Sequence, residues 1–217
     1  MKSKLSRFIF VHIMKTAGTS VSQNLKRIYK RKYLLDTTYR MARNKQKIFY
    51  FDTMDSHYPN RFKKGYPQKY KKYDVIHGHF TIKKYEHLGW PVITFLRHPI
   101  ERVTSQYFSA IENIQTDFIY AKPLPFTEFC KQTANTMTKM TGGDLSKFSF
   151  VGIVEKFPES LERLGKFIGR DLKVLVTNKT KNKKELNHKQ INLIKKYNRK
   201  DLELYSRALE EFGGRGK

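Results

Sequence analysis

The sequence contains little cysteine and no long apolar run, and each shortage excludes a class of protein. Cys130 is the one cysteine among 217 residues, so neither an intrachain disulfide framework nor a cysteine-based zinc site can form. The apolar stretch 8–13, which follows a basic amino terminus, is too short for a signal peptide and far too short to span a bilayer. We therefore expect a cytoplasmic protein without a membrane span, in which Cys130 is a small buried apolar residue.

Acidic residues are also scarce, because 19 Asp and Glu stand against 44 Lys and Arg and leave a net charge of +25. A chain this basic is expected to bind anions: nucleic acid, an acidic polysaccharide, an anionic membrane surface or a phosphorylated small molecule. The stretch 61–73 mixes six cations with four aromatic residues, which suits a polyanion-binding surface as well as a solvated basic loop. With 16 Phe and 13 Tyr, the chain has the apolar bulk for a folded core.

The chain shows no repeat, no low-complexity tract and no Pro- or Ser-rich linker, so we expect a single domain over residues 1–217. Short apolar runs alternate with amphipathic stretches, a pattern typical of an α/β fold with a parallel sheet. Strands are predicted at 8–13, 74–80, 92–96, within 151–157 and at 173–177. Helices are predicted after Gly18, after Pro99, through 161–168 and over 188–212.

The strongest local signal is the segment FVHIMKTAGTS at 10–20, which indicates a strand, a tight turn and a helix start. Small residues in the turn let backbone N–H groups approach an anion, and the helix amino terminus adds a partial positive charge. We interpret the turn as a phosphate-binding loop, although it is not a Walker A loop, whose lysine follows the second glycine. A plain turn with Thr19 or Ser20 as the helix cap is the alternative. The candidate binding residues are Lys15, Thr16, Ala17, Gly18, Thr19 and Ser20.

A second signal is the segment 92–107, in which Arg97 follows a predicted strand and Ser105 lies about two helical turns further on. An arginine at the carboxyl end of a parallel strand can bind a second phosphate in a bidentate contact, and a serine on the following helix can add a hydrogen bond. The alternative is a surface ion pair between Arg97 and Glu101.

A third signal is the segment HGHF at 77–80, with two histidines at the end of a predicted strand. Strand alternation places His77 and His79 on one face, and histidine is the usual general base near neutral pH. Metal chelation is the rival interpretation, but no third ligand stands at an obvious spacing. The other histidines, His12 included, are singly placed and are expected to be structural or surface residues.

Taken together, the three segments resemble the sulfotransferases that use 3′-phosphoadenosine 5′-phosphosulfate (PAPS), in particular the glycan-modifying branch that includes the heparan sulfate 2-O-sulfotransferases. In that family a PKTGGT-like loop binds the 5′-phosphosulfate; here Met14 stands where proline is usual and Ala17 where glycine is common. The resemblance implies that Arg97 and Ser105 bind the 3′-phosphate. His98 departs from the frequent Asp or Asn after that arginine.

The resemblance extends over about residues 8–207. The segment 151–164 is similar to a strand–helix unit of the family, and 176–183 to a late loop that closes over the donor nucleotide. It implies a P-loop-NTPase-like central parallel sheet flanked by helices, with PAPS as the donor and no metal ion. The donor-binding residues implied by the late loop are Lys179, Thr180 and Lys183.

In the implied reaction a sulfuryl group moves in line from PAPS to an acceptor hydroxyl. His79 is expected to remove the acceptor proton, with His77 orienting it or sharing that role, and Lys15 to stabilise charge on the leaving phosphate. A glycan is the favoured acceptor; a lipid, a peptide tyrosine and a small molecule remain open. The alternatives from other classes are a nucleotide-dependent kinase-like enzyme and a non-catalytic polyanion-binding protein, which includes nucleic-acid binders.

Overall fold

The computed structural model describes residues 5–36, 70–116, 124–175 and 185–214. At its centre lies a five-stranded sheet with the order β2-β3-β1-β4-β5, in which every neighbouring pair is parallel. The strands are β1 (Phe8–Val11), β2 (Tyr33–Asp36), β3 (Val75–Gly78), β4 (Val92–Leu96) and β5 (Phe150–Ile153). The predicted α/β class with a central parallel sheet is confirmed.

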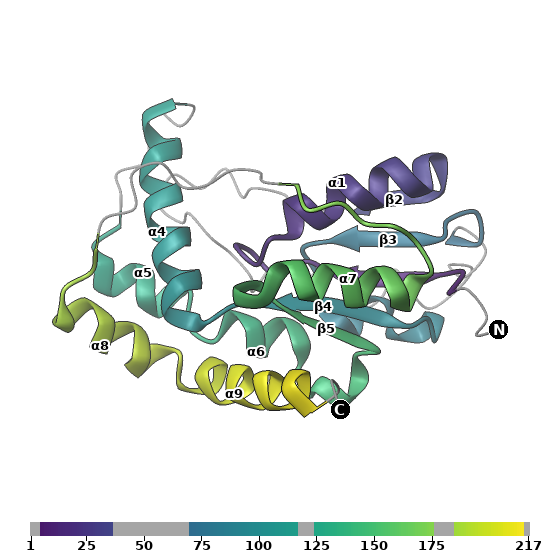
Figure 1. The fold of residues 1–217 in the computed structure, drawn as a ribbon. Helices are drawn as coiled ribbons and strands as arrows, with labels where there is room; N and C mark the ends of the chain where they lie inside the picture. The colour runs from purple at the N-terminus through teal and green to yellow at the C-terminus, as the bar shows by residue number, and fades with distance from the viewer. Residues whose placement is uncertain (1–4, 37–69, 117–123, 176–184, 215–217) are drawn as a thin grey trace.

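Helices cover both faces of the sheet, because the strands are apolar on both sides. Phe8 and Phe10 pack against α1 (Gly18–Tyr29) and α7 (Phe157–Ile168) on one face. Ile9 and Val11 pack on the other face, where α6 (Thr136–Thr141) and α9 (Arg199–Gly214) lie. Figure 1 shows these two helical layers on either side of the sheet.

A third cluster lies beyond the sheet and joins α4 (Pro99–Thr116), α5 (Phe126–Gln132) and α8 (His188–Tyr197) (Figure 1). Its buried centre consists of Val103, Phe129, Cys130 and Ile194. Cys130 is fully buried, and burial raises the pKa of its thiol to about 12. The prediction that Cys130 is a buried apolar residue is confirmed. Short 3₁₀ turns complete the described chain: η1 (Lys30–Lys32), η2 (Ile82–Leu88), η3 (Leu145–Lys147) and η4 (Val154–Lys156).

Two predicted elements are wrong. The helix predicted over 188–212 is two helices, α8 and α9, which separate at Asn198, whose side chain accepts hydrogen bonds from Asn135 and Arg102. The strand predicted at 173–177 is absent from the described residues 173–175. The Asn24 side chain bonds both the N–H and the carbonyl of Lys173, and so takes the place of a neighbouring strand. Residues 176 and 177 lie outside the described residues.

Among the described residues, no helix combines the length and the apolar character that crossing a bilayer requires.

Candidate functional site

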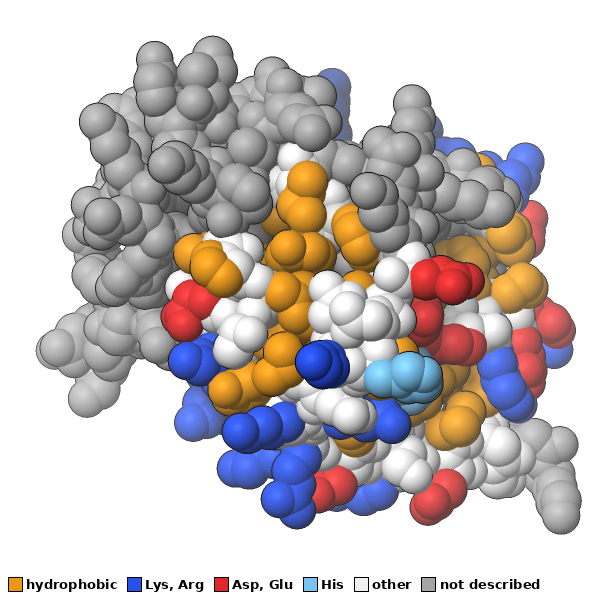
Figure 2. Space-filling model, turned by 90° about the vertical axis from the view of Figure 1, so that its left-hand side faces the viewer, with side chains coloured by type: hydrophobic (Ala, Val, Ile, Leu, Met, Phe, Trp, Pro, Cys, Tyr) orange, Lys and Arg blue, Asp and Glu red, His pale blue; other side chains and the backbone are white. Residues whose placement is uncertain are grey.

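The three predicted segments meet at one edge of the sheet, because each includes the carboxyl end of a neighbouring parallel strand. The loop 12–17 follows β1, His79 follows β3, and Arg97 follows β4. The arrowhead of β3 points to the left in Figure 1, so Figure 2 looks onto this edge. Hydrophobic side chains occupy the centre of the described face in Figure 2, and Lys and Arg side chains gather at its bottom, where α8 lies in Figure 1.

The loop after β1 has a backbone suited to an anion. Helix α1 begins at Gly18, and its first bonded amides, those of Ser20 and Val21, both donate to the carbonyl of Ala17. The N–H groups that precede the first helical bonds have no helical partner and are available to a negatively charged ligand. The predicted cap at Thr19 or Ser20 is wrong: Ala17 occupies the cap position with φ 60°, and no side chain of the described residues caps the helix.

Two hydrogen bonds fix the shape of this loop. Thr16 Oγ1 donates to the Ile13 carbonyl over 2.7 Å, so this buried hydroxyl serves the loop itself. Arg97 Nη1 donates to the Lys15 carbonyl over 3.2 Å. The second bond joins the first and second predicted motifs directly.

Gly18 is required by the close approach of a ring. A Cβ atom on Gly18 would lie 1.9 Å from Nε2 of His12, far inside contact distance. The start of α1 therefore packs directly against the His12 imidazole, and any larger residue at 18 would displace it.

The histidines form a stack at the end of the sheet. The ring centroids of His12 and His79 are 4.2 Å apart, those of His12 and His77 are 4.9 Å apart, and Phe10 stacks on His77 at 4.8 Å. His77 and His79 therefore lie on one face, as predicted. His12, which is singly placed in the sequence, is a structural part of this stack, because pairing of Phe10 with His77 brings His12 beside His79.

His79 is oriented by the backbone of the loop. Its Nδ1 lies 2.7 Å from the carbonyl oxygen of His12. A carbonyl only accepts, so Nδ1 carries the proton, and the lone pair of the neutral ring is on Nε2. Burial lowers the pKa of His79, and the bond to His12 partly opposes that shift.

His77 has a different environment. Its Nδ1 is bonded to the Tyr33 hydroxyl at 2.5 Å, and that hydroxyl also contacts Ser22 Oγ at 2.9 Å. Burial, and then the nearby His79 and Lys26, lower the pKa of His77 to about 3. Its Nε2 is buried and has no partner among the described residues. His77 is thus a neutral, enclosed ring.

Arg97 and Ser105 occupy the places that the second motif predicts. Arg97 forms the anticipated ion pair with Glu101, 3.6 Å apart, in addition to its bond to the loop. Its Nε is buried and unpartnered among the described residues, so the guanidinium is not saturated by the bonds to Lys15 and Glu101. Ser105 lies buried on the second turn of α4.

Glu155 fixes the turn between β4 and α4, and sequence analysis did not single it out. Its Oε1 accepts from the backbone N–H of His98 over 2.9 Å, and its Oε2 accepts from Tyr205 over 2.8 Å. The His98 ring meets the edge of Tyr205 at 5.4 Å. His98, which departs from the family pattern, thus packs on α9.

The remaining predicted donor residues, Lys179, Thr180 and Lys183, lie outside the described residues, as does most of the basic stretch 61–73. Within the described residues, no group of three His, Cys, Asp or Glu is placed to hold a metal ion.

A cavity of about 400 Å³ is lined by Arg7, Tyr29, Asp74 and Arg170, among others. Arg7 and Asp74 directly precede β1 and β3, so this cavity lies at the amino ends of the strands, opposite the candidate site.

A protein-family model described as the sulfotransferase family matches residues 3–207. The match spans nearly the whole sequence, and the chain belongs to the sulfotransferase family. A comparison with curated proteins finds no match.

Among solved structures, the chain is similar to a sulfotransferase from Alicyclobacillus acidocaldarius, at 13% identity and a TM-score of 0.52, over 94% of this chain and 95% of that one. It is also similar to the mouse sulfotransferase SULT7A1 complexed with PAP, at 13% identity and a TM-score of 0.43, over 89% of this chain and 64% of that one. The first likeness agrees with the predicted P-loop-NTPase-like sheet, the fold of sulfotransferases.

Proposed function

We propose that the protein transfers a sulfuryl group from PAPS to a hydroxyl group of a glycan acceptor. One observation carries this proposal: the loop 12–17 contacts both other motifs, through the Arg97–Lys15 bond and the His79–His12 bond. This loop therefore holds the anion-binding groups next to the candidate base. This is the arrangement that in-line transfer from a bound anionic donor to a neutral hydroxyl requires.

The described residues fit such a donor. The amides at the start of α1 and the Lys15 ammonium would hold the 5′-phosphosulfate end. Arg97, with its unpartnered Nε, and Ser105 would hold the 3′-phosphate. Lys179, Thr180 and Lys183 are proposed to close over the nucleotide.

His79 is the proposed general base. Its Nδ1 is bonded to the backbone, so Nε2 is the nitrogen that can accept the acceptor's proton, and its lowered pKa keeps the ring neutral at pH 7. His77 is proposed to position this ring through the stack with His12, because its own Nδ1 is engaged by Tyr33.

In the proposed step, one bond to sulfur forms and one breaks. The acceptor oxygen forms a bond to sulfur and loses its proton to His79, while the bond from sulfur to the 5′-phosphate oxygen breaks. Lys15 and the loop amides stabilise the negative charge that this oxygen gains. The chain's own part is thus to hold both reactants, take one proton and stabilise one oxygen.

A glycan acceptor that carries carboxylates or sulfates is supported by the net charge of +25 and by the Lys and Arg side chains at the bottom of the face in Figure 2. Those on α8 are Lys189, Lys195 and Lys196. A positive rim raises the encounter rate with a polyanion in a salt-dependent way. The kinase-like and purely polyanion-binding alternatives are not favoured by membership of the sulfotransferase family.

The test is calorimetric titration with 3′-phosphoadenosine 5′-phosphate (PAP), the spent donor, with ATP–magnesium as the control ligand. We expect metal-independent PAP binding that Arg97→Ala weakens by about 2–3 kcal/mol, the range for a charge-assisted contact. A preference for ATP–magnesium, or PAP affinity that survives Arg97→Ala intact, would contradict the proposal.

A further inference from the structure

The loop that carries Lys15 has a backbone that its surroundings must hold in place. Lys15 and Ala17 adopt positive φ angles of 63° and 60°, although neither is glycine. Such residues persist in this left-handed region only where surrounding contacts over-determine the conformation. The side chains that make these contacts therefore matter for the geometry of the candidate donor site.

Two of these side chains come from the segment that also carries the candidate 3′-phosphate residues. Arg97 bonds the Lys15 carbonyl, and Gln106 Nε2 lies 3.9 Å from Met14 Sδ, a weak hydrogen bond to sulfur. Met14 replaces the proline that is usual in this loop, and methionine leaves its own φ angle unrestricted. The contact with Gln106 thus restrains Met14, which lacks the pyrrolidine ring that fixes φ in proline.

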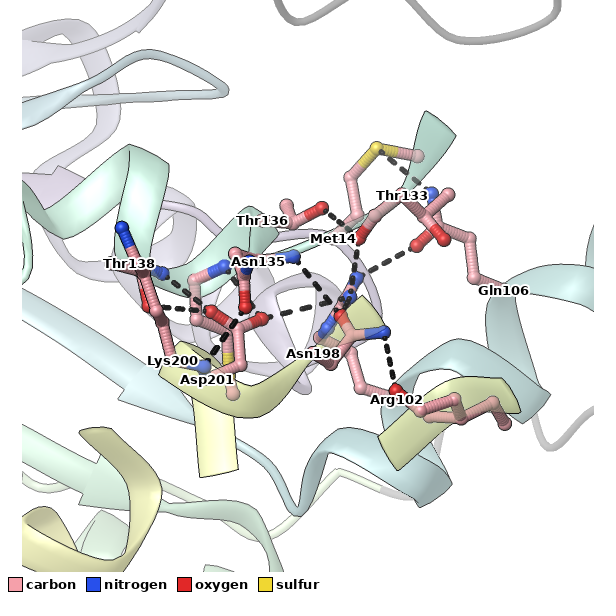
Figure 3. Close-up of polar contacts among 12 residues, drawn as sticks. Met14, Arg102, Gln106, Thr133, Asn135, Thr136, Thr138, Asn198, Lys200 and Asp201 are labelled. Carbon is pink, nitrogen blue, oxygen red and sulfur yellow. Dashed lines mark hydrogen bonds and ion pairs between the residues drawn. The ribbon is translucent and has the colours of Figure 1, made fainter. Parts of the chain in front are cut away.

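The amide of Gln106 is itself oriented by Arg102, one helical turn earlier. Arg102 Nη1 donates to Gln106 Oε1 over 2.8 Å, and this turns the amide nitrogen toward Met14, as Figure 3 shows. Gln106 is only 1% exposed, so water cannot easily replace either contact. Gln106 therefore links the loop to Arg102.

Arg102 is fully buried and is held by groups from other parts of the chain (Figure 3). Its Nη2 donates to the Thr133 carbonyl over 3.2 Å and to Asn198 Oδ1 over 3.4 Å, and lies 3.8 Å from Asp201 Oδ2. Burial lowers the pKa of the guanidinium, and the Asp201 carboxylate opposes that shift. These partners place Arg102, and α4 with it, at a defined position.

Asp201 in turn anchors the pair to α6. Its Oδ1 accepts from the backbone N–H and the hydroxyl of Thr138, over 2.7 and 2.8 Å. Its Oδ2 accepts from the backbone N–H of Met137 over 3.1 Å. The carboxylate is fully buried, and a buried ion pair needs such additional hydrogen bonds to be tolerated. One ionic cluster therefore joins α4, α6 and α9.

We propose that Arg102 and Gln106 are positioning residues for binding of the sulfuryl donor, an inference that rests on the function proposed above. The Arg102–Asp201 pair fixes α4 against α6 and α9. Gln106, which lies on α4, contacts Met14 and so holds the strained loop against this helix. The same helix is proposed to bind the other end of the donor. Neither side chain needs to contact the donor, so their loss loosens the loop and weakens donor binding without removing the base.

Two nearly isosteric variants test the link to the loop. Gln106→Glu keeps an acceptor for Arg102 and removes the donor to Met14; Met14→Leu keeps the volume and removes the sulfur. We expect either variant to weaken PAP binding about five- to tenfold, which is the effect of one hydrogen bond. The double variant should lose no more PAP affinity than either single variant, because both changes remove the same contact. Hydrogen exchange in the ligand-free protein should be faster at the amides of residues 15–19 in each variant.

Thr104→Val is the matched control, because Thr104 is also buried on α4 and its hydroxyl bonds, among the described residues, only the Ile100 carbonyl of the same helix. We expect it to leave PAP affinity and loop exchange unchanged. Unaltered PAP affinity and loop exchange in Gln106→Glu would overturn the proposal, as would equal losses in Thr104→Val.

The role of Arg102 is tested by removing both charges together, in Arg102→Met with Asp201→Leu, because removal of one leaves the other buried and uncompensated. We expect a folded protein with weakened PAP binding and faster loop exchange. A folded double variant with wild-type PAP affinity would overturn the role of Arg102; if it does not fold, the Gln106 and Met14 variants decide the proposal. If the wild-type protein binds no PAP while loop exchange still responds, the proposed function fails and the positioning of the loop stands.

Discussion

The imidazole of His12 lies so close to Gly18 that it leaves no space for a side chain at position 18. A Cβ atom there would fall 1.9 Å from Nε2, 2.0 Å from Cδ2 and 2.5 Å from Cε1 of the ring. Because the same ring stacks on His79 at 4.2 Å, displacement of His12 would move the proposed base. This contact therefore joins the start of α1 to the geometry of the histidine stack.

Gly18→Ala should accordingly destabilise the fold by about 1–3 kcal/mol, the usual cost of overpacking, and lower sulfuryl transfer. Urea unfolding and a transfer assay would measure the two effects. Gly213→Ala is the control, since no atom of the described residues lies within 4 Å of its added Cβ near the end of α9. Alanine in a helix is favoured over glycine, so the control should be unchanged or slightly more stable. Equal stability of Gly18→Ala and the wild-type protein would contradict this account of the contact.

The buried neutral state of His77 makes stability depend on pH. Its pKa is about 3 in the folded protein and 6.5 in the unfolded chain, so the unfolded chain binds more protons between these values. The contribution of His77 is therefore fully present above pH 6.5 and is lost as the pH falls toward 3. His77→Phe keeps a stacked ring without the titration, and should reduce the slope of unfolding free energy against pH by up to about 1.4 kcal/mol per unit.

Urea unfolding of both proteins between pH 4 and 7.5 would measure this difference. His12 and His79 also have lowered pKa values, so a residual slope should remain in the variant. Identical slopes would mean that His77 is accessible to protons in the folded state.

Asn24 should couple the late loop to α1. Its side chain accepts from the Lys173 N–H over 2.8 Å and donates to the Lys173 carbonyl over 2.8 Å, just ahead of the segment with Lys179 and Lys183. Asn24→Leu leaves those backbone groups unpaired, so we expect a loss of about 1–3 kcal/mol in stability and weaker PAP binding. Thermal unfolding and calorimetry would test this, and unchanged PAP affinity would show that the late loop is placed independently of Asn24.

The sheet and the three motifs could be predicted because their signals are local. Strands β1, β3 and β4 are short apolar runs, and each motif lies at the carboxyl end of one of them. Strand β2 was not predicted, since it is an edge strand whose residues are only partly buried. Its Tyr33 nevertheless reaches His77.

The residues that support the site could not be predicted, because their roles depend on pairing between distant segments. His12 joins the stack only through the register of β1 on β3. Arg102 and Asp201 are ordinary charged positions on amphipathic helices until the packing of α4 on α9 buries both. Asn198 breaks a continuous helical pattern because tertiary hydrogen bonds use its side chain.

The central claim is that His79 removes the acceptor proton beside a donor held by the loop. The most direct measurement is transfer of labelled sulfate from PAPS to uronic-acid polysaccharides by His79→Ala, with PAP affinity measured in parallel. Loss of a general base should lower the turnover number by about 10²–10⁴ and change PAP affinity little, because the bond from His79 to the His12 carbonyl is only one of the contacts of the loop. Wild-type turnover, or equal losses in turnover and PAP affinity, would contradict the assignment of His79 as the base.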